Sequence, residues 1–302
     1  MGENGDEDFD CSGFRLTAAL RSTSMNPLRF SFGRVWLIAQ NTFREAVRQR
    51  LFNFIALLAV ALVLGAQWFR DLDFGSSELK FIADFGFGAM AFFGAALTIL
   101  ASAQLFFSEI EQRTVLTLLS KPMRRSEFVV GKFIGVSLVT ASFCVALTVL
   151  LAAVLWSRET ALMRSFPDVF DHGRAIDYAA VLIAGFAQWL KLAILSALTL
   201  LIATLVRTQL FATTAGFLIL VICHLSFLAD RSAQRADSTG GRWVAELISR
   251  SVPDFRLFDL SESVGSSDVV GWGQLVRLTV YTICYGAAIC SLAAFVFRRR
   301  EI

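Results

Sequence analysis

Five stretches of this chain run for 19 to 25 residues without any Asp, Glu, Lys or Arg, and they constrain the fold more than any other feature. They cover residues 51–69, 85–108, 133–157, 208–229 and 278–297. A helix needs about 20 apolar residues to cross about 30 Å of hydrocarbon, so each stretch is long enough to span a bilayer. Apolar residues make up 56% of the chain and charged residues 18%, against about 45–50% and about 25% in soluble domains. The sequence therefore predicts an all-α integral membrane protein.

A sixth apolar stretch, 178–206, is interrupted by Lys191. If this helix ends near Arg207, Lys191 lies about 24 Å away, near the far edge of the hydrocarbon. We therefore expect this span to begin near residue 187, with Trp189 in the interfacial aromatic belt. Residues 176–186 are then expected to lie along the membrane or re-enter it, with a bend at Gly185. The six predicted spans are 51–69, 86–107, 133–156, 187–206, 209–229 and 276–297.

The positive charges predict the orientation. If the N-terminus is cytoplasmic, the segments on its side carry 16 bases and 10 acids, and the segments on the other side 10 bases and 15 acids. Because cytoplasmic loops are enriched in Lys and Arg, we expect both termini in the cytoplasm. The chain is then a multi-pass protein of the cytoplasmic (inner) membrane. Residues 1–27 lack the apolar core of a secretory signal, so we expect none, and residues 1–33 are expected to form a mobile tail.

Residues 34–50 precede the first span and have two distinct helical faces. One face is apolar or small (Val35, Ala39, Thr42, Phe43, Ala46), and the other is polar (Arg34, Asn41, Arg44, Glu45, Arg48). This pattern predicts an interfacial amphipathic helix. It would serve as a membrane anchor, as a lever that touches a cytosolic partner, or as both.

The loop between the second and third spans is the most informative segment. Glu109 and Arg113 are four residues apart, acid first, which favours a helical turn, and Pro122 ends that helix. The helix carries an apolar patch outside any span (Val115, Leu116, Leu118, Leu119). An exposed apolar patch rimmed by charge is typical of an interface. The alternative is a helix that rests on the lipid surface.

This loop, SEIEQRTVLTLLSKPMRRSEFVVGKFIG, resembles the signature loop of permease subunits of ABC-2 type transporters, also called type V exporters. The similarity extends to NTFREAVRQRLFNFIALLAVALV, CHLSFLAD and PDFRLFDL, and the branch grouped with multicopper-enzyme maturation looks most similar. The resemblance implies a cytoplasmic coupling helix in the loop and a connecting helix at 34–50, with Arg44, Glu45 and Arg48. The implied ATPase-coupling residues are Glu109, Glu111, Arg113, Thr114, Leu116, Leu118, Leu119, Lys121, Pro122, Arg125, Glu127 and Lys132.

The resemblance also implies partners. Two ABC ATPase subunits would bind ATP and Mg, and a second copy of the permease or a sister permease would complete the complex in the bilayer. The sequence has no GxxxxGK[ST] phosphate loop and no HExxH or GxSxG motif, so we expect no catalysis and no cofactor on this chain. We also expect no nucleic-acid partner. His224 lies beside Cys223, but adjacent helical residues point about 100° apart, so we expect a packed polar residue and no metal site.

Two other functions fit the sequence less well. An ion-coupled secondary transporter needs an ionisable residue inside the membrane, and no Asp or Glu falls within the predicted spans. A membrane scaffold would transmit ATPase motion for signalling or protein maturation without moving a solute. The sequence assigns no substrate, direction or substrate path. The outer loop 230–272 is expected to form a cap over the pore mouth; the alternative is a gate for substrate or partner.

Overall fold

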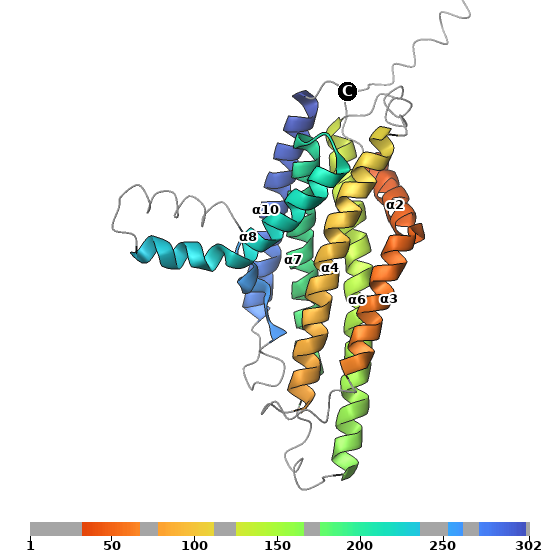
Figure 1. Cartoon of the computed structure of the whole chain (residues 1–302), viewed down its shortest axis with the longest axis vertical. Helices are drawn as coiled ribbons and strands as arrows, with labels where there is room; N and C mark the ends of the chain where they lie inside the picture. The colour runs from red at the N-terminus through yellow and green to blue at the C-terminus, as the bar shows by residue number, and fades with distance from the viewer. Residues whose placement is uncertain are drawn as a thin grey trace, which may run out of the picture.

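The computed structural model describes residues 32–66, 78–111, 125–165, 176–235, 253–261 and 272–299. Within these ranges the regular elements are helices, arranged as an elongated bundle (Figure 1). In chain order they are α2 (Phe32–Arg48), α3 (Arg50–Gly65), α4 (Glu78–Glu111), α6 (Arg125–Ser165), α7 (Tyr178–Leu205), α8 (Gln209–Arg235), the 3-10 helix η3 (Phe255–Phe258) and α10 (Trp272–Arg299).

Four of these helices, α4, α6, α7 and α10, are long and apolar enough to cross a bilayer. The pair α2 and α3 becomes a fifth if it is counted as one span, although the two helices meet at 67°. α8 adds a shorter apolar stretch, Gln209–Leu225. The described part of the chain therefore has the predicted all-helical membrane architecture with four to five candidate spans, and six spans remain a prediction.

α7 is the central helix of the bundle. It contacts α4, α6, α8 and α10, and every residue from 190 to 200 is buried. A helix that is apolar on all sides can only be stable when other helices or lipid surround it. Exposed apolar side chains lie on the surrounding helices and near the two ends of α7, among them Phe54, Val276 and Leu205.

The start of α7 differs from the prediction. The helix begins at Tyr178, where the Asp177 side chain accepts a hydrogen bond from the Ala179 N–H at 2.9 Å. Gly185 lies inside the continuous helix, and a Cβ there would overlap Thr148 of α6. The predicted bend at Gly185, with a separate piece over 176–186, is therefore wrong. The glycine allows two membrane helices to approach closely.

Lys191 lies in the middle of α7, about 20 Å along the helix from Tyr178. Its side chain is 6% exposed. The helix continues for more than three turns before Lys191, and where the membrane boundary crosses it stays a prediction. Trp189 is partly buried, and its indole Nε1 donates to the Ser137 carbonyl of α6 at 3.0 Å.

The two ends of the bundle are held by different contacts. The start of α2, the end of α4, the start of α6 and the end of α10 gather at one end, which we call the loop end (Figure 1). Towards the opposite end, Arg158 of α6 pairs with Glu78 of α4. The buried carboxylate of Glu159 accepts hydrogen bonds from the Tyr178 hydroxyl at 2.6 Å and the Ile176 N–H at 3.3 Å. These contacts fix α6 to both α4 and α7.

Candidate functional site

The candidate coupling site is the loop end, where α4 and α6 border the predicted coupling loop. The loop itself falls outside the described residues, and with it Arg113, Thr114, Leu116, Leu118, Leu119, Lys121 and Pro122. Glu109 and Glu111 belong to the last turn of α4 and Arg125 to the first turn of α6, but their side chains are not described. The structure therefore defines the helices from which the loop leaves and returns.

The predicted connecting helix corresponds to α2, and its small face is buried. Val35, Ala39, Thr42 and Ala46 are the buried residues, and they lie on the face that the sequence marks as apolar. This face packs on α6, so it contacts protein and not lipid. The larger apolar side chains Phe32, Trp36 and Leu37 remain exposed. An interfacial position for α2 is still a prediction, and these three side chains are the ones that would contact lipid.

Two glycines of α6 set the distance to α2. A Cβ on Gly131 would lie 2.8 Å from the Ile38 Cβ, and one on Gly135 would lie 2.6 Å from the Thr42 Cβ. Both distances are shorter than van der Waals contact. The spacing of four residues places both glycines on one face of α6. Sequence reasoning recognised the GK pair but missed this contact, although the GxxxG spacing is visible at 131–135.

A hydrogen bond joins α2 to the end of α4. The Ser108 hydroxyl donates to the Glu45 carboxylate at 3.1 Å. Ser108 lies one residue before Glu109, where the predicted coupling segment begins. Arg44 and Arg48, also predicted for the connecting helix, lie on the same helix without such a contact to α4 being described. Of these three residues, Glu45 is thus the one that the described structure brings to the loop.

An ion pair joins α2 to the start of α6. Arg34 Nε lies 3.7 Å from Glu127 Oε2, and the Glu127 side chain is completely buried, whereas that of Arg34 is 32% exposed. A buried carboxylate needs a partner, because removing its charge from water costs several kcal/mol. The loop motif predicts Glu127 as a coupling residue. The structure places it at the contact between α2 and α6.

Lys132 lies in an aromatic cluster at the loop end. Its Nζ lies 5.8 Å from the Phe128 ring centroid, and the side chain is fully buried. Phe128 packs against Phe106 of α4 and stacks on Phe297 of α10, with centroid distances of 6.1 and 5.8 Å. The last turns of α10 are thereby joined to the two helices that border the loop. The loop end is a packed block of α2, α4, α6 and α10.

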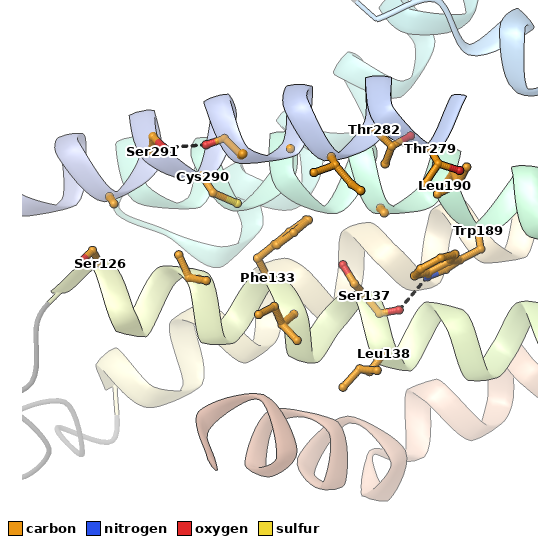
Figure 2. A pocket seen from close by; sticks show the side chains of 17 residues that line it. Ser126, Phe133, Ser137, Leu138, Trp189, Leu190, Thr279, Thr282, Cys290 and Ser291 are labelled. Carbon is orange, nitrogen blue, oxygen red and sulfur yellow. Dashed lines mark hydrogen bonds between the residues drawn. The ribbon is translucent and has the colours of Figure 1, made fainter. Parts of the chain in front are cut away.

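A groove opens on the side of the bundle between α6, α7 and α10, with a volume of about 600 Å³. Figure 2 shows Phe133 and Leu138 of α6 and Thr282 and Cys290 of α10 along it, with the hydrogen bond between Trp189 and Ser137 at one end. Its lining is mostly apolar, which suits a surface that faces hydrocarbon chains. Sequence reasoning did not find it, because its residues come from three separate helices.

Several polar and aromatic side chains lie around Lys191 in the middle of α7. Its Nζ lies 5.7 Å from the centroid of the Phe255 ring, and Asp259 is near enough to interact with it electrostatically. The His224 ring meets Phe255 edge-on at 5.7 Å, and its Nδ1 lies 3.1 Å from the Leu220 carbonyl. In the part of the chain that the structure describes, His, Cys, Asp and Glu form no group of three that could hold a metal. His224 is therefore part of the packing around Phe255.

The chain matches a known protein family over most of its length. The model of the family described as ABC-2 family transporter protein matches residues 36–230, which include most of α2, all of α4, α6 and α7, and the loop between α4 and α6. No curated protein matches the chain. The matched range thus covers the packed loop end apart from α10 and the first residues of α2, which include Arg34.

Proposed function

Because this chain belongs to the ABC-2 family of transporter proteins, as a membrane-embedded ABC transporter permease, we propose that it is the permease subunit of an exporter. ATP hydrolysis takes place on a separate ABC ATPase, and the loop 109–122 carries the coupling helix that contacts it. Family membership implies the ATPase partner and the membrane. Two ATPase subunits, a second permease copy or sister permease, six spans and cytoplasmic termini are parts of the proposal. So is the branch grouped with multicopper-enzyme maturation.

The observation that carries the coupling proposal is the position of α2. This helix is bonded to the end of α4 through Glu45 and Ser108, and to the start of α6 through Arg34 and Glu127. The loop leaves α4 and returns to α6, so α2 holds both of its ends. A force on the loop would move α2, α4 and α6 together and would not bend one helix alone.

The proposed cycle uses this block as a two-state element. Binding of ATP closes the partner ATPase dimer and displaces the coupling helix. The loop end passes the displacement to α4 and α6, and their packing against α7 changes. The free energy comes from the nucleotide, and the permease supplies the element that has two arrangements.

The position of Lys191 bears on the ion-coupled alternative. The sequence places this lysine at the rim of a span, which argues against ion coupling, whereas the structure places it in the middle of a helix. The argument against ion coupling therefore rests on membership of the ABC-2 family. The scaffold alternative differs from the exporter in one respect, because it predicts ATP hydrolysis without any flux of solute in sealed vesicles.

The coupling proposal is tested by pull-down of the ATPase with loop variants. If the loop helix docks in a cleft of the ATPase, Leu119 is a buried anchor, and Leu119→Asp should cost about 2 kcal/mol or more of binding. Association is then lost while the permease stays inserted and folded. Glu111→Lys reverses a charge at the rim, so it should cost about 1 kcal/mol and depend on salt.

Leu119→Met is the matched control, since it keeps an apolar side chain of similar volume and should bind as the wild type does. If the helix rests on lipid instead, Leu119→Asp loosens the loop and leaves the complex intact. Retention of the ATPase at the wild-type level by Leu119→Asp therefore contradicts the proposal.

A further inference from the structure

The groove between α6, α7 and α10 runs along the bundle from its middle to the loop end. On α6 its lining extends from Leu138 to Ser126 in the first turn, and on α10 from Thr279 to Ala294 (Figure 2). At 1.5 Å per residue these stretches are about 18 and about 22 Å long. One leaflet of a bilayer contributes half of the hydrocarbon, about 15 Å. The groove is therefore as long as the lipid chains of one leaflet.

The lining makes little demand for a polar ligand. The hydroxyls of Thr279, Thr282 and Ser291 each donate to the carbonyl four residues earlier on α10, at 2.8, 2.9 and 2.7 Å. Most of the remaining lining is apolar. A volume of about 600 Å³ lies within the usual range of ligand pockets, about 300–1,000 Å³. A hydrocarbon chain meets these conditions.

The sequence places basic residues where the groove reaches the loop end. α6 begins with Arg125, the residue before the first one that lines the groove. The last turn of α10 contains Arg298 and Arg299, which follow Ala294 by four and five residues, or about 6–8 Å along the helix. The two helices that form the sides of the groove thus contribute three arginines at this end.

The other charges of this region do not cancel the arginines. Glu127 lies in the same turn of α6 as Arg125, but its carboxylate is completely buried and pairs with Arg34 of α2. The N-terminus of a helix also carries a partial positive charge, and α6 begins here. The end of the groove is therefore suited to an anionic group.

We propose that the groove binds one acyl chain of an anionic phospholipid, whose phosphate lies at the arginines of α6 and α10. The apolar lining alone would not select a lipid, because the bilayer offers a chain equally apolar surroundings. Selection comes from the charge, as in other basic pockets between membrane helices that bind anionic head groups. The binding does not rest on the proposed function of the chain.

Trp189 is a natural reporter for the deep end of the groove. It lines the groove, and its indole N–H is held by the Ser137 carbonyl at 3.0 Å. Ser137 follows Arg125 by 12 residues, so the ring lies about 18 Å along α6 from the basic end, where the tail of a bound chain would end. Trp156 of α6 is more than half exposed and is not among the lining residues, so it reports on ordinary lipid contact.

The test uses the full chain in nanodiscs of phosphatidylcholine, without an ATPase. A rising share of the lipid is phosphatidylglycerol with bromine near the ends of its acyl chains, because bromine quenches tryptophan fluorescence on contact. One variant keeps Trp189 as its only tryptophan, the matched control keeps Trp156, and the other five are phenylalanine in each. Trp189 should reach half of its quenching at a share at least fivefold lower than Trp156 does. With brominated phosphatidylcholine the two should be quenched alike.

Two further changes separate the chain from the head group. Ser291→Phe fills the groove beside the loop end and should abolish the early quenching of Trp189. Leu292→Phe is its control, because Leu292 is the next exposed residue of α10 and is not among the lining residues. Arg298→Gln combined with Arg299→Gln should weaken the preference for phosphatidylglycerol about tenfold or more and make it less sensitive to salt.

Equal quenching of Trp189 by the two brominated lipids would overturn the proposal, because the groove would then hold ordinary lipid. Absence of quenching would overturn it as well, since another occupant would fill the groove. Early quenching that persists in Ser291→Phe would place the lipid elsewhere. Thermal unfolding shows which variants are folded.

If a single-tryptophan variant fails to fold, native mass spectrometry replaces the fluorescence. The wild type should retain one phosphatidylglycerol molecule that Ser291→Phe loses and Leu292→Phe keeps, and retention by Ser291→Phe would contradict the proposal. None of these measurements involves an ATPase or the loop 109–122, so their failure is distinct from a failure of the coupling proposal.

Discussion

Arg34 and Glu127 form an ion pair across the contact between α2 and α6, and the two members of the pair differ in burial. The carboxylate is completely buried, whereas the guanidinium keeps about a third of its exposure. The two ways of breaking the pair are therefore unequal. Loss of the arginine removes one partner of a buried carboxylate, whereas loss of the carboxylate leaves a cation that can turn towards solvent or lipid headgroups.

Arg34→Ala should accordingly destabilise the permease by about 2–3 kcal/mol, because a buried carboxylate loses one charged partner. Glu127→Gln should cost about 1–2 kcal/mol, because the amide fills the same space and carries no charge. Thermal unfolding of both variants in one detergent measures the difference. Equal losses of stability would mean that the pair contributes through packing alone.

Because α2 lies so close to α6, we expect two glycine substitutions to change the free energy of unfolding in different directions. Gly135→Ala places a Cβ 2.6 Å from that of Thr42, so α2 must move, and we expect a loss of about 1–3 kcal/mol. Gly88→Ala on α4 meets nothing within 4 Å and should be neutral or stabilising by up to about 1 kcal/mol, because alanine favours the helix.

Unfolding temperatures measured side by side compare the two glycine variants. Coupled ATP hydrolysis in the assembled transporter should fall for Gly135→Ala and not for Gly88→Ala. If both variants raised the unfolding temperature, or both lowered it, the result would argue against the packing of α2 on α6.

The hydrogen bond across the groove allows a test of the bundle between α6 and α7. Trp189→Phe removes the indole N–H that the Ser137 carbonyl accepts and should cost about 1 kcal/mol. Trp156→Phe is the matched control, because Trp156 is more than half exposed and should change stability by less than about 0.5 kcal/mol. Equal effects in unfolding experiments would show that the hydrogen bond contributes nothing.

The six-span topology is tested with reporter fusions. Fusions after Arg50, Lys121 and Ile302 should be cytoplasmic, and fusions near Ser77, Asp168 and Ser251 should be external. The charge distribution and the even number of spans both require this pattern. A cytoplasmic reporter at Ser251 would contradict six spans, because the polar segment around it cannot remain in lipid.

The helices themselves could be predicted from the sequence, because long apolar stretches have few ways to satisfy their backbone in a bilayer. The start of α7 could not. The prediction assumes that Lys191 must reach water, and the structure places its ammonium group over the ring of Phe255, which lies more than 60 residues further along the chain. A single sequence does not show that such a distant segment will supply the partner of a charge.

The sequence also predicted only part of the candidate site. The coupling role that the loop motif gives to Glu127 and Lys132 stays a prediction, whereas the helical wheel identified the buried face of α2. The wheel could not show whether that face contacts lipid or protein, because both surroundings accept Ala and Val. The deciding residues were Gly131 and Gly135 on another helix, whose missing side chains make room for α2.

The length of α6 has a mechanical consequence. Its 41 residues form one helix of about 60 Å, roughly twice the thickness of the hydrocarbon layer, and it contains no proline. It is clamped near one end by Glu127 and near the other by Arg158 and Glu159. If the contacts at both ends moved with it, a tilt of about 10° around its midpoint would displace each end by about 5 Å in opposite directions, without any change in the helix itself.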